Sequence, residues 1–106
     1  MKKSIKIKIP HLKYTVFILD KSKAVGITKE YLKTRNACAV RVNNTTATVF
    51  IKMPVKQLQF PLLVHELVHV LQYIARDRDM DFIQEQEHFA YIMHYILNQV
   101  LGYEFQ

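Results

Sequence analysis

Residues 61–75 read PLLVHELVHVLQYIA, and this stretch decides how the chain folds. Proline fits the first turn of a helix but not its interior, so the sequence predicts a helix that begins near Leu58 or Pro61 and ends near Ala75. Apolar residues occupy nearly the whole circumference of that helix, which is typical of a helix buried at the centre of a domain. They are Leu62, Leu63, Val64, Leu67, Val68, Val70, Leu71 and Ile74.

The chain before this helix is rich in strand patterns. Isoleucine and lysine alternate near the start, a β-branched and aromatic run follows, and two further runs flank an Asn-Asn-Thr turn, which suits a hairpin. The predicted strands cover residues 4–9, 14–19, 36–42 and 46–53.

Two more helices complete the predicted order of elements. One is expected over residues 22–34, with Ser22 as its N-cap, and a long one from residue 82 to about residue 102, after a charged turn over residues 76–81. All strands precede the last two helices. The order therefore predicts an α+β fold, in which a small, mostly antiparallel sheet is followed by two long C-terminal helices packed on one face.

Length and composition narrow the class of protein. The chain has 106 residues and a mass of 12.6 kDa, which predicts a single domain over residues 1–106. Cys38 is the only cysteine, so the sequence excludes an intramolecular disulfide and a cysteine-rich zinc finger. No apolar run has the length that a signal peptide or a membrane span needs. We therefore expect a cytoplasmic protein with no membrane partner.

Charge is divided unevenly along the chain. Residues 1–56 hold 13 Lys and Arg and 2 acids, a balance of +11, whereas residues 57–106 hold 2 Lys and Arg and 7 acids, a balance of −5. A basic half attracts nucleic acid or acidic partners. No nucleic-acid motif accompanies it, and lysines that alternate with isoleucines are typical of an ordinary solvated strand face. Nucleic acid is therefore an alternative partner without a motif to support it.

The predicted central helix carries a motif with a direct chemical meaning. Residues 65–69 read HELVH, the pattern H-E-x-x-H. Histidines at i and i+4 lie on one face of a helix, so His65 and His69 can bind one metal ion through their imidazole nitrogens. Glu66 is rotated by about 100° and can reach a water bound to that ion. A metal-bound water beside a carboxylate is a hydrolytic nucleophile with its base in place.

A catalytic zinc ion usually has three protein ligands, and the third is expected from the last helix. Glu87 is the favoured candidate, with His88 and Glu85 as alternatives. Glu85 lies about 200° around the helix from Glu87, so the two cannot both be ligands. His94, about 10.5 Å from Glu87 along the axis, is too far to share the ion but close enough to line the cleft.

These motifs resemble those of the gluzincin clan of zinc metallopeptidases. H65-E-L-V-H69 followed by E87-x-x-A90 matches the clan pattern over roughly residues 58–95, and the small size is similar to minigluzincins and to short H-E-x-x-H proteins encoded by phages. The resemblance implies a minimal zincin-like fold and one Zn²⁺ per chain. It implies that His65, His69 and Glu87 are the ligands and that Glu66 is the general base and later the proton donor.

The resemblance also has implications for the substrate and its surroundings. It implies a peptide or protein substrate that pairs with a strand at the sheet edge, for which residues 46–53 are the candidate. Tyr91 stands where larger gluzincins often have an acid or amide that orients a zinc-binding histidine. Tyr91, His94 and Tyr73 are candidate donors to the oxyanion of the transition state. A phage-encoded chain would act in the host cytoplasm.

Three alternatives accompany this prediction. The chain could be a non-catalytic, zinc-stabilised phage structural or binding protein, although such a site has no need of Glu66. It could be a nucleic-acid-associated metalloprotease, in which His88 replaces Glu87 as the ligand. The apolar character of the last helix also leaves room for a dimer formed through it.

Overall fold

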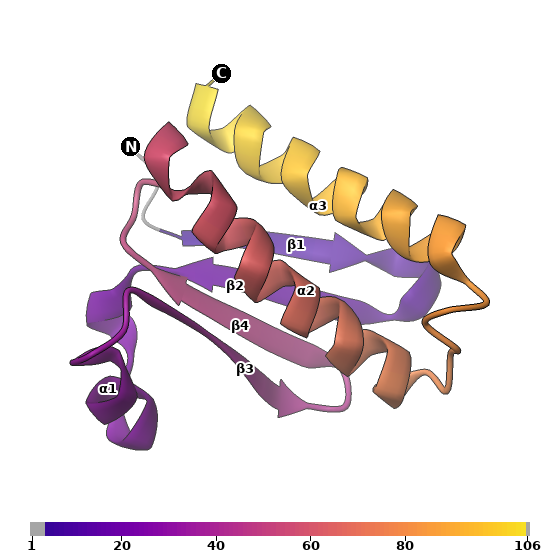
Figure 1. Cartoon of the computed structure of the whole chain (residues 1–106), viewed down its shortest axis with the longest axis horizontal. Coiled ribbons are helices and arrows are strands. Elements are labelled where there is room, and N and C mark those ends of the chain that lie inside the picture. Colours follow the sequence, from indigo (N-terminus) through magenta and orange to yellow (C-terminus); the bar gives the residue numbers. More distant parts are fainter. Residues whose placement is uncertain (1–3, 106) are drawn as a thin grey trace.

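The structure, a computed structural model, describes residues 4–105, with side chains over residues 4–102. Four strands form one sheet in the order β1 (Ser4–Ile9), β2 (Tyr14–Leu19), β4 (Thr46–Ile51) and β3 (Ala37–Asn43). Two long helices, α2 (Phe60–Asp77) and α3 (Gln86–Phe105), lie side by side on one face of this sheet (Figure 1). The predicted α+β class, with two long helices after a small sheet, is confirmed.

The sheet is mixed rather than simply antiparallel. β1 pairs antiparallel with β2, and β3 pairs antiparallel with β4, but β2 and β4 run parallel at the centre. The parallel pair arises because the chain passes through α1 (Gly26–Leu32) and β3 between β2 and β4. β4 is therefore an inner strand, so the expectation that residues 46–53 form an edge strand is wrong. The edges are β1 and β3.

The core lies between the sheet and the two long helices. Every second residue of β1 is buried, and these are Ile5, Ile7 and Ile9, as the alternation predicts. α2 contacts β3 and β4, whereas α3 contacts β1. The helical residues buried in this core include Leu63, Leu67, Val70 and Ile74 of α2 and Phe89, Ile92, Ile96 and Val100 of α3.

Helix α1 is shorter than the sequence predicts. A separate 3-10 turn (Lys21–Lys23) precedes it, and the Asp20 carboxylate caps that turn by accepting a hydrogen bond from the Ser22 amide. Gly26, the first residue of α1, has a φ of 61°, a left-handed conformation that is incompatible with the interior of a right-handed helix, so no helix runs through it from residue 22. The expected helix over residues 22–34 is therefore confined to α1, and Ser22 is not its N-cap.

The two long helices also differ slightly from expectation. α2 has Pro61 in its first turn, as predicted, and extends to Asp77. α3 begins at Gln86 rather than near residue 82, because the Asp81 side chain accepts hydrogen bonds from the amides of Ile83 and Gln84 and forms a turn there.

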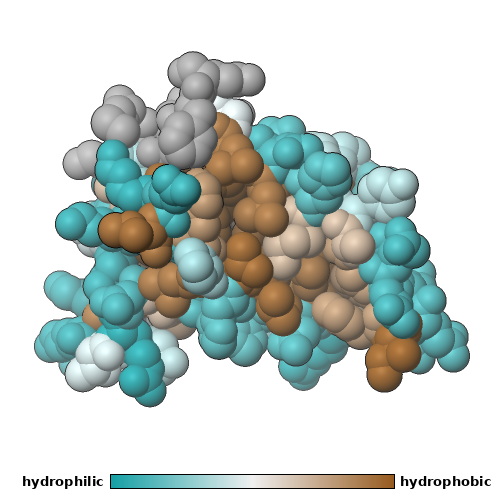
Figure 2. All heavy atoms as spheres, turned by 45° about the horizontal axis from the view of Figure 1, so that its top comes forward, coloured by the Kyte–Doolittle hydropathy of each residue, from teal (hydrophilic) through white to brown (hydrophobic). Residues whose placement is uncertain are grey.

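The surface of the long helices is partly apolar. Val64 and Val68 are 36% and 38% exposed, so α2 is not buried all round as its composition suggests. Figure 2 shows hydrophobic residues gathered in a band at the centre of the face it displays. The apolar character of α3, which left room for a dimer, is largely used within the chain, because Ile92, Ile96 and Val100 belong to its core. Tyr91, Tyr95 and Leu101 of α3 are exposed. No helix in the described part of the chain is long and apolar enough to span a membrane.

Asp77, the last residue of α2, ties this helix to the sheet. Its carboxylate accepts a 2.9 Å hydrogen bond from the Tyr14 hydroxyl and lies 2.7 Å from the Arg41 guanidinium. The Asp77 side chain is only 4% exposed, so these two groups replace the water that would otherwise solvate its charge. The hydrogen bond from Arg41 lowers the pKa of Asp77 below its ordinary value.

Arg78, the next residue, joins the same end of α2 to two turns of the sheet. Its guanidinium donates hydrogen bonds to the carbonyl oxygens of Leu12, Lys13 and Asn44, at 2.7, 3.0 and 2.8 Å. Leu12 and Lys13 connect β1 to β2, and Asn44 lies in the turn between β3 and β4. Asp77 and Arg78 together fix where the C-terminal end of α2 lies on the sheet.

We expect Asp77→Ala to lower the free energy of unfolding by about 2–4 kcal/mol, because the Tyr14 hydroxyl loses its acceptor and Arg41 its partner. Urea denaturation measures this change. Glu30→Ala is the control, because the Glu30–Lys33 pair is highly exposed and should contribute nothing measurable.

The same carboxylate links stability to pH. Because folding lowers the pKa of Asp77, its carboxylate stabilises the folded chain fully at a pH above the unfolded pKa of about 3.9. This stabilisation is lost as the pH falls through the lowered pKa of the folded chain. Asp77→Asn should therefore reduce the acid-dependent loss of stability. An identical acid titration of the variant and the wild type would contradict the assigned role.

Candidate metal centre

The apolar face of α2 determines where the H-E-x-x-H side chains lie. Leu63, Leu67 and Val70 face the sheet, and the helical repeat of 3.6 residues then turns His65 and His69 toward the opposite side. His65 is exposed and His69 is partly exposed. Their ring centroids are 5.2 Å apart, so the structure brings the two predicted ligands together. The Gln72 side chain, one turn on, lies 3.2 Å from Nδ1 of His69.

Glu66 occupies the flank of α2 between the buried face and the histidines. It is 8% exposed, one of the few buried polar side chains among the described residues. The charge of Glu66 affects the pKa of two neighbouring side chains on the β3 side of α2. Burial is the main cause that raises the pKa of the Cys38 thiol and of the Tyr73 hydroxyl, and the Glu66 carboxylate raises both further.

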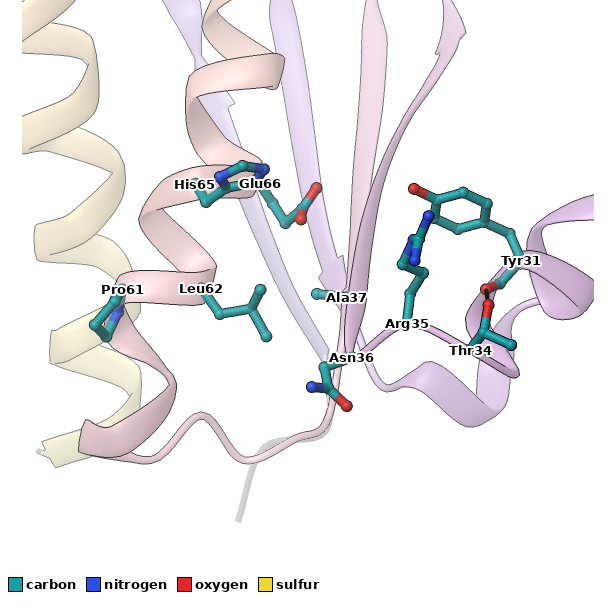
Figure 3. A pocket seen from close by; sticks show the side chains of 9 residues that line it. All are labelled: Tyr31, Thr34, Arg35, Asn36, Ala37, Pro61, Leu62, His65 and Glu66. Carbon is teal, nitrogen blue, oxygen red and sulfur yellow. Dashed lines mark hydrogen bonds between the residues drawn. The ribbon is translucent and has the colours of Figure 1, made fainter.

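The His65–Glu66 end of this group opens into a cavity of about 570 Å³. Figure 3 shows the Glu66 carboxylate pointing from α2 toward the strands. The opposite wall is formed by the end of α1 and the start of β3. Residues that line the cavity include Tyr31, Arg35, Asn36, Leu62, His65 and Glu66. The sequence offered no signal for Tyr31, Arg35 and Asn36, because they lie some thirty residues before the motif and meet it only through the fold.

Tyr73 is the only candidate oxyanion donor on the Glu66 side of α2. It lies seven residues after Glu66, about two helical turns, so both side chains face β3. Its hydroxyl donates a 3.2 Å hydrogen bond to the carbonyl oxygen of Ala39. The hydroxyl therefore holds α2 to the edge strand and has no second proton to donate to an oxyanion.

Glu87 does not join His65 and His69. It lines a small cavity with Ala90, Tyr91 and His94, all on α3, and no group of three or more His, Cys, Asp or Glu in the described part of the chain is placed to hold a metal ion. The reason is the side of α2 on which α3 packs. α3 lies over β1 (Figure 1), whereas the Glu66 side chain points from α2 toward the cavity whose other wall includes the start of β3 (Figure 3). The expectation that Glu87 completes the ligand set is therefore not met.

The other α3 candidates also lie away from the motif. His88 Nε2 is 2.9 Å from Nε2 of His11, and Glu85 lies 3.7 Å from Nδ1 of His88. His88 and Glu85 thus form a separate cluster beside β1. Tyr91 is 69% exposed and lines a different cavity with His11 and Ile9. His94 is exposed on the same helix. The predicted roles of Tyr91 and His94 at the metal site have no support in this arrangement.

The donor set fits a zinc ion only in part. Two imidazoles one helical turn apart are suitable nitrogen ligands. The residues do not fit the three-ligand set that the sequence predicts. If an ion binds here, His65 and His69 are the two protein ligands that this arrangement supplies.

We expect His65→Ala or His69→Ala to weaken zinc binding by at least about tenfold, because each removes one of two imidazole ligands. Glu87→Ala should change the affinity by less than about threefold. Competition with a chromophoric chelator measures all three, and His94→Ala controls for loss of an exposed histidine. A loss of zinc in Glu87→Ala as large as in His65→Ala would contradict the arrangement.

Comparison of the chain with protein-family models, with curated proteins and with solved structures finds no match in any of the three. The gluzincin resemblance therefore stays a prediction that depends on the motifs at residues 65–69 and 87–90. Of these two motifs, the structure brings together the side chains of the first and leaves Glu87 apart from them.

Proposed function

We propose that the chain is a zinc-dependent metallopeptidase in which His65 and His69 hold the ion. The observation that carries the proposal is the placement of a buried carboxylate, Glu66, in a cavity that His65 also lines, with the ring of His69 5.2 Å from that of His65. Zinc, when bound, supplies a Lewis acid that lowers the pKa of a coordinated water.

Glu66 is the residue that moves the proton. Its carboxylate is acceptor-only when ionised, so it can take a proton from a water at the histidine pair and later give it to the leaving amine. The low exposure of Glu66 keeps bulk water from competing for this hydrogen bond. Its position on the flank of α2 directs the carboxylate toward the cavity, where a substrate would lie.

The edge strand β3 is the element that a peptide substrate would pair with. The Ala39 carbonyl oxygen accepts a hydrogen bond from Tyr73, so this group points away from β4. The backbone groups of every second residue in a strand point the same way, so those of Ala37 also point away from β4. Ala37 lines the cavity. An extended peptide added there would pass the Glu66 carboxylate. This role belongs to β3 and not to residues 46–53, because β4 is an inner strand.

The alternative of a non-catalytic zinc-stabilised protein fits the geometry less well. A structural zinc site is closed and has four protein ligands, whereas His65 lines an open cavity and His69 is partly exposed. The core between sheet and helices contains neither His65 nor His69. The nucleic-acid-associated alternative uses His88 as a ligand, but His88 faces His11.

We expect Glu66→Gln to lower peptide hydrolysis by at least about 10²-fold, because the amide cannot accept the proton, while zinc content and folding persist. Cleavage of an unbiased peptide mixture, followed by mass spectrometry, measures the activity. Glu30→Gln is the matched control for loss of a carboxylate. Equal activity in Glu66→Gln and the wild type would overturn the assignment of the base.

Removal of zinc should leave the chain folded, because the core forms without the histidines. Far-UV circular dichroism in excess chelator is expected to keep its helical signal, with a cooperative thermal transition. Unfolding on metal removal, as in zinc fingers, would instead favour the structural alternative.

A further inference from the structure

The wall of the cavity that faces Glu66 is basic. It comes from residues 31–37 at the end of α1 and the start of β3, and Arg35 is the only Lys or Arg that lines it. Glu66 is the only acid that lines the same cavity. The two walls thus carry opposite charges. Figure 3 shows Arg35 and Tyr31 side by side on the wall away from α2.

Arg35 lies against an aromatic ring. Its guanidinium carbon is 5.2 Å from the centroid of the Tyr31 ring. Stacking covers one face of a guanidinium but leaves the N–H groups along its edge available. Those groups have the geometry that a carboxylate accepts with both oxygens.

Arg35 also lacks a carboxylate partner within the described part of the chain. None of the described acids lies within ion-pair distance of it. The nearby Glu30 pairs with Lys33 at 3.0 Å, and Lys21 adds a further positive charge by donating to the Arg35 carbonyl oxygen. A positive group that is oriented, unpaired with an acid and beside a cavity is a site for an anionic ligand.

We propose that Arg35 determines specificity by binding a carboxylate of the peptide substrate, on an acidic side chain or at the C-terminus. This inference rests on the proposed function, because it names the substrate class of the same cleft. Glu66 repels a carboxylate from its own wall and Arg35 attracts it to the opposite one, so the two residues together set the position of the peptide.

Peptide binding in a chelator tests this without catalysis. With zinc removed, the wild type can neither cleave a peptide nor coordinate its carboxylate. Fluorescence anisotropy compares two labelled peptide pools of equal length, one with a single Asp per peptide and one with Asn, each with free and amidated C-termini. We expect a carboxylate-bearing pool to bind about tenfold more tightly than the amidated Asn pool. The tight-binding pool identifies which carboxylate is used.

Two variants separate a specific contact from general attraction. Arg35→Ala should bring all pools to within about twofold of one another, whereas Lys33→Ala, which removes the same charge outside the cavity, should keep the preference. Equal binding of all pools to the wild type, or equal effects of the two variants, would overturn the proposal. Arg35-dependent binding together with an absence of cleavage by the zinc-loaded chain would contradict the peptidase function alone.

Discussion

Burial of one face of α2 against the sheet is the constraint on which the rest of the structure depends. Leu63, Leu67, Val70 and Ile74 are fully buried, so the rotation of this helix about its axis is determined by apolar packing. Asp77 and Arg78 then hold its C-terminal end to β2, β3 and two turns. With rotation and position set, the flank that carries Glu66 faces β3, and the two histidines face outward.

The chemistry of the cleft follows from that placement. A helix flank with a buried carboxylate forms one wall, and the segment from α1 into β3 brings Arg35 and Tyr31 to the other. Both walls depend on the sheet. The second wall includes the start of β3, and Ala39 of β3 accepts the hydrogen bond from Tyr73 of α2, the helix that carries the first wall. The Glu66 carboxylate and the Arg35 guanidinium thereby lie on opposite sides of one cavity.

Local patterns predicted more of this fold than of the site. Alternation in residues 4–9 and Pro61 in the first turn of the long helix each depend on a few neighbouring residues, and both predictions are confirmed. The i, i+4 spacing likewise brings the rings of His65 and His69 together, while metal binding by them stays a prediction. The features that the sequence did not predict depend on distant contacts. Strand order puts β4 inside the sheet, and α3 packs on the side of α2 away from Glu66, which leaves Glu87 apart from His65. Arg35 enters the cleft for the same non-local reason.

Anomalous diffraction at the zinc absorption edge, from crystals grown with added zinc, would locate a bound ion. We expect one strong peak about 2.0–2.1 Å from an imidazole nitrogen of His65 and of His69, with the Glu66 carboxylate beyond coordination distance. The absence of a peak at that pair, or a peak only at His11 and His88, would contradict the assignment of His65 and His69 as the zinc ligands.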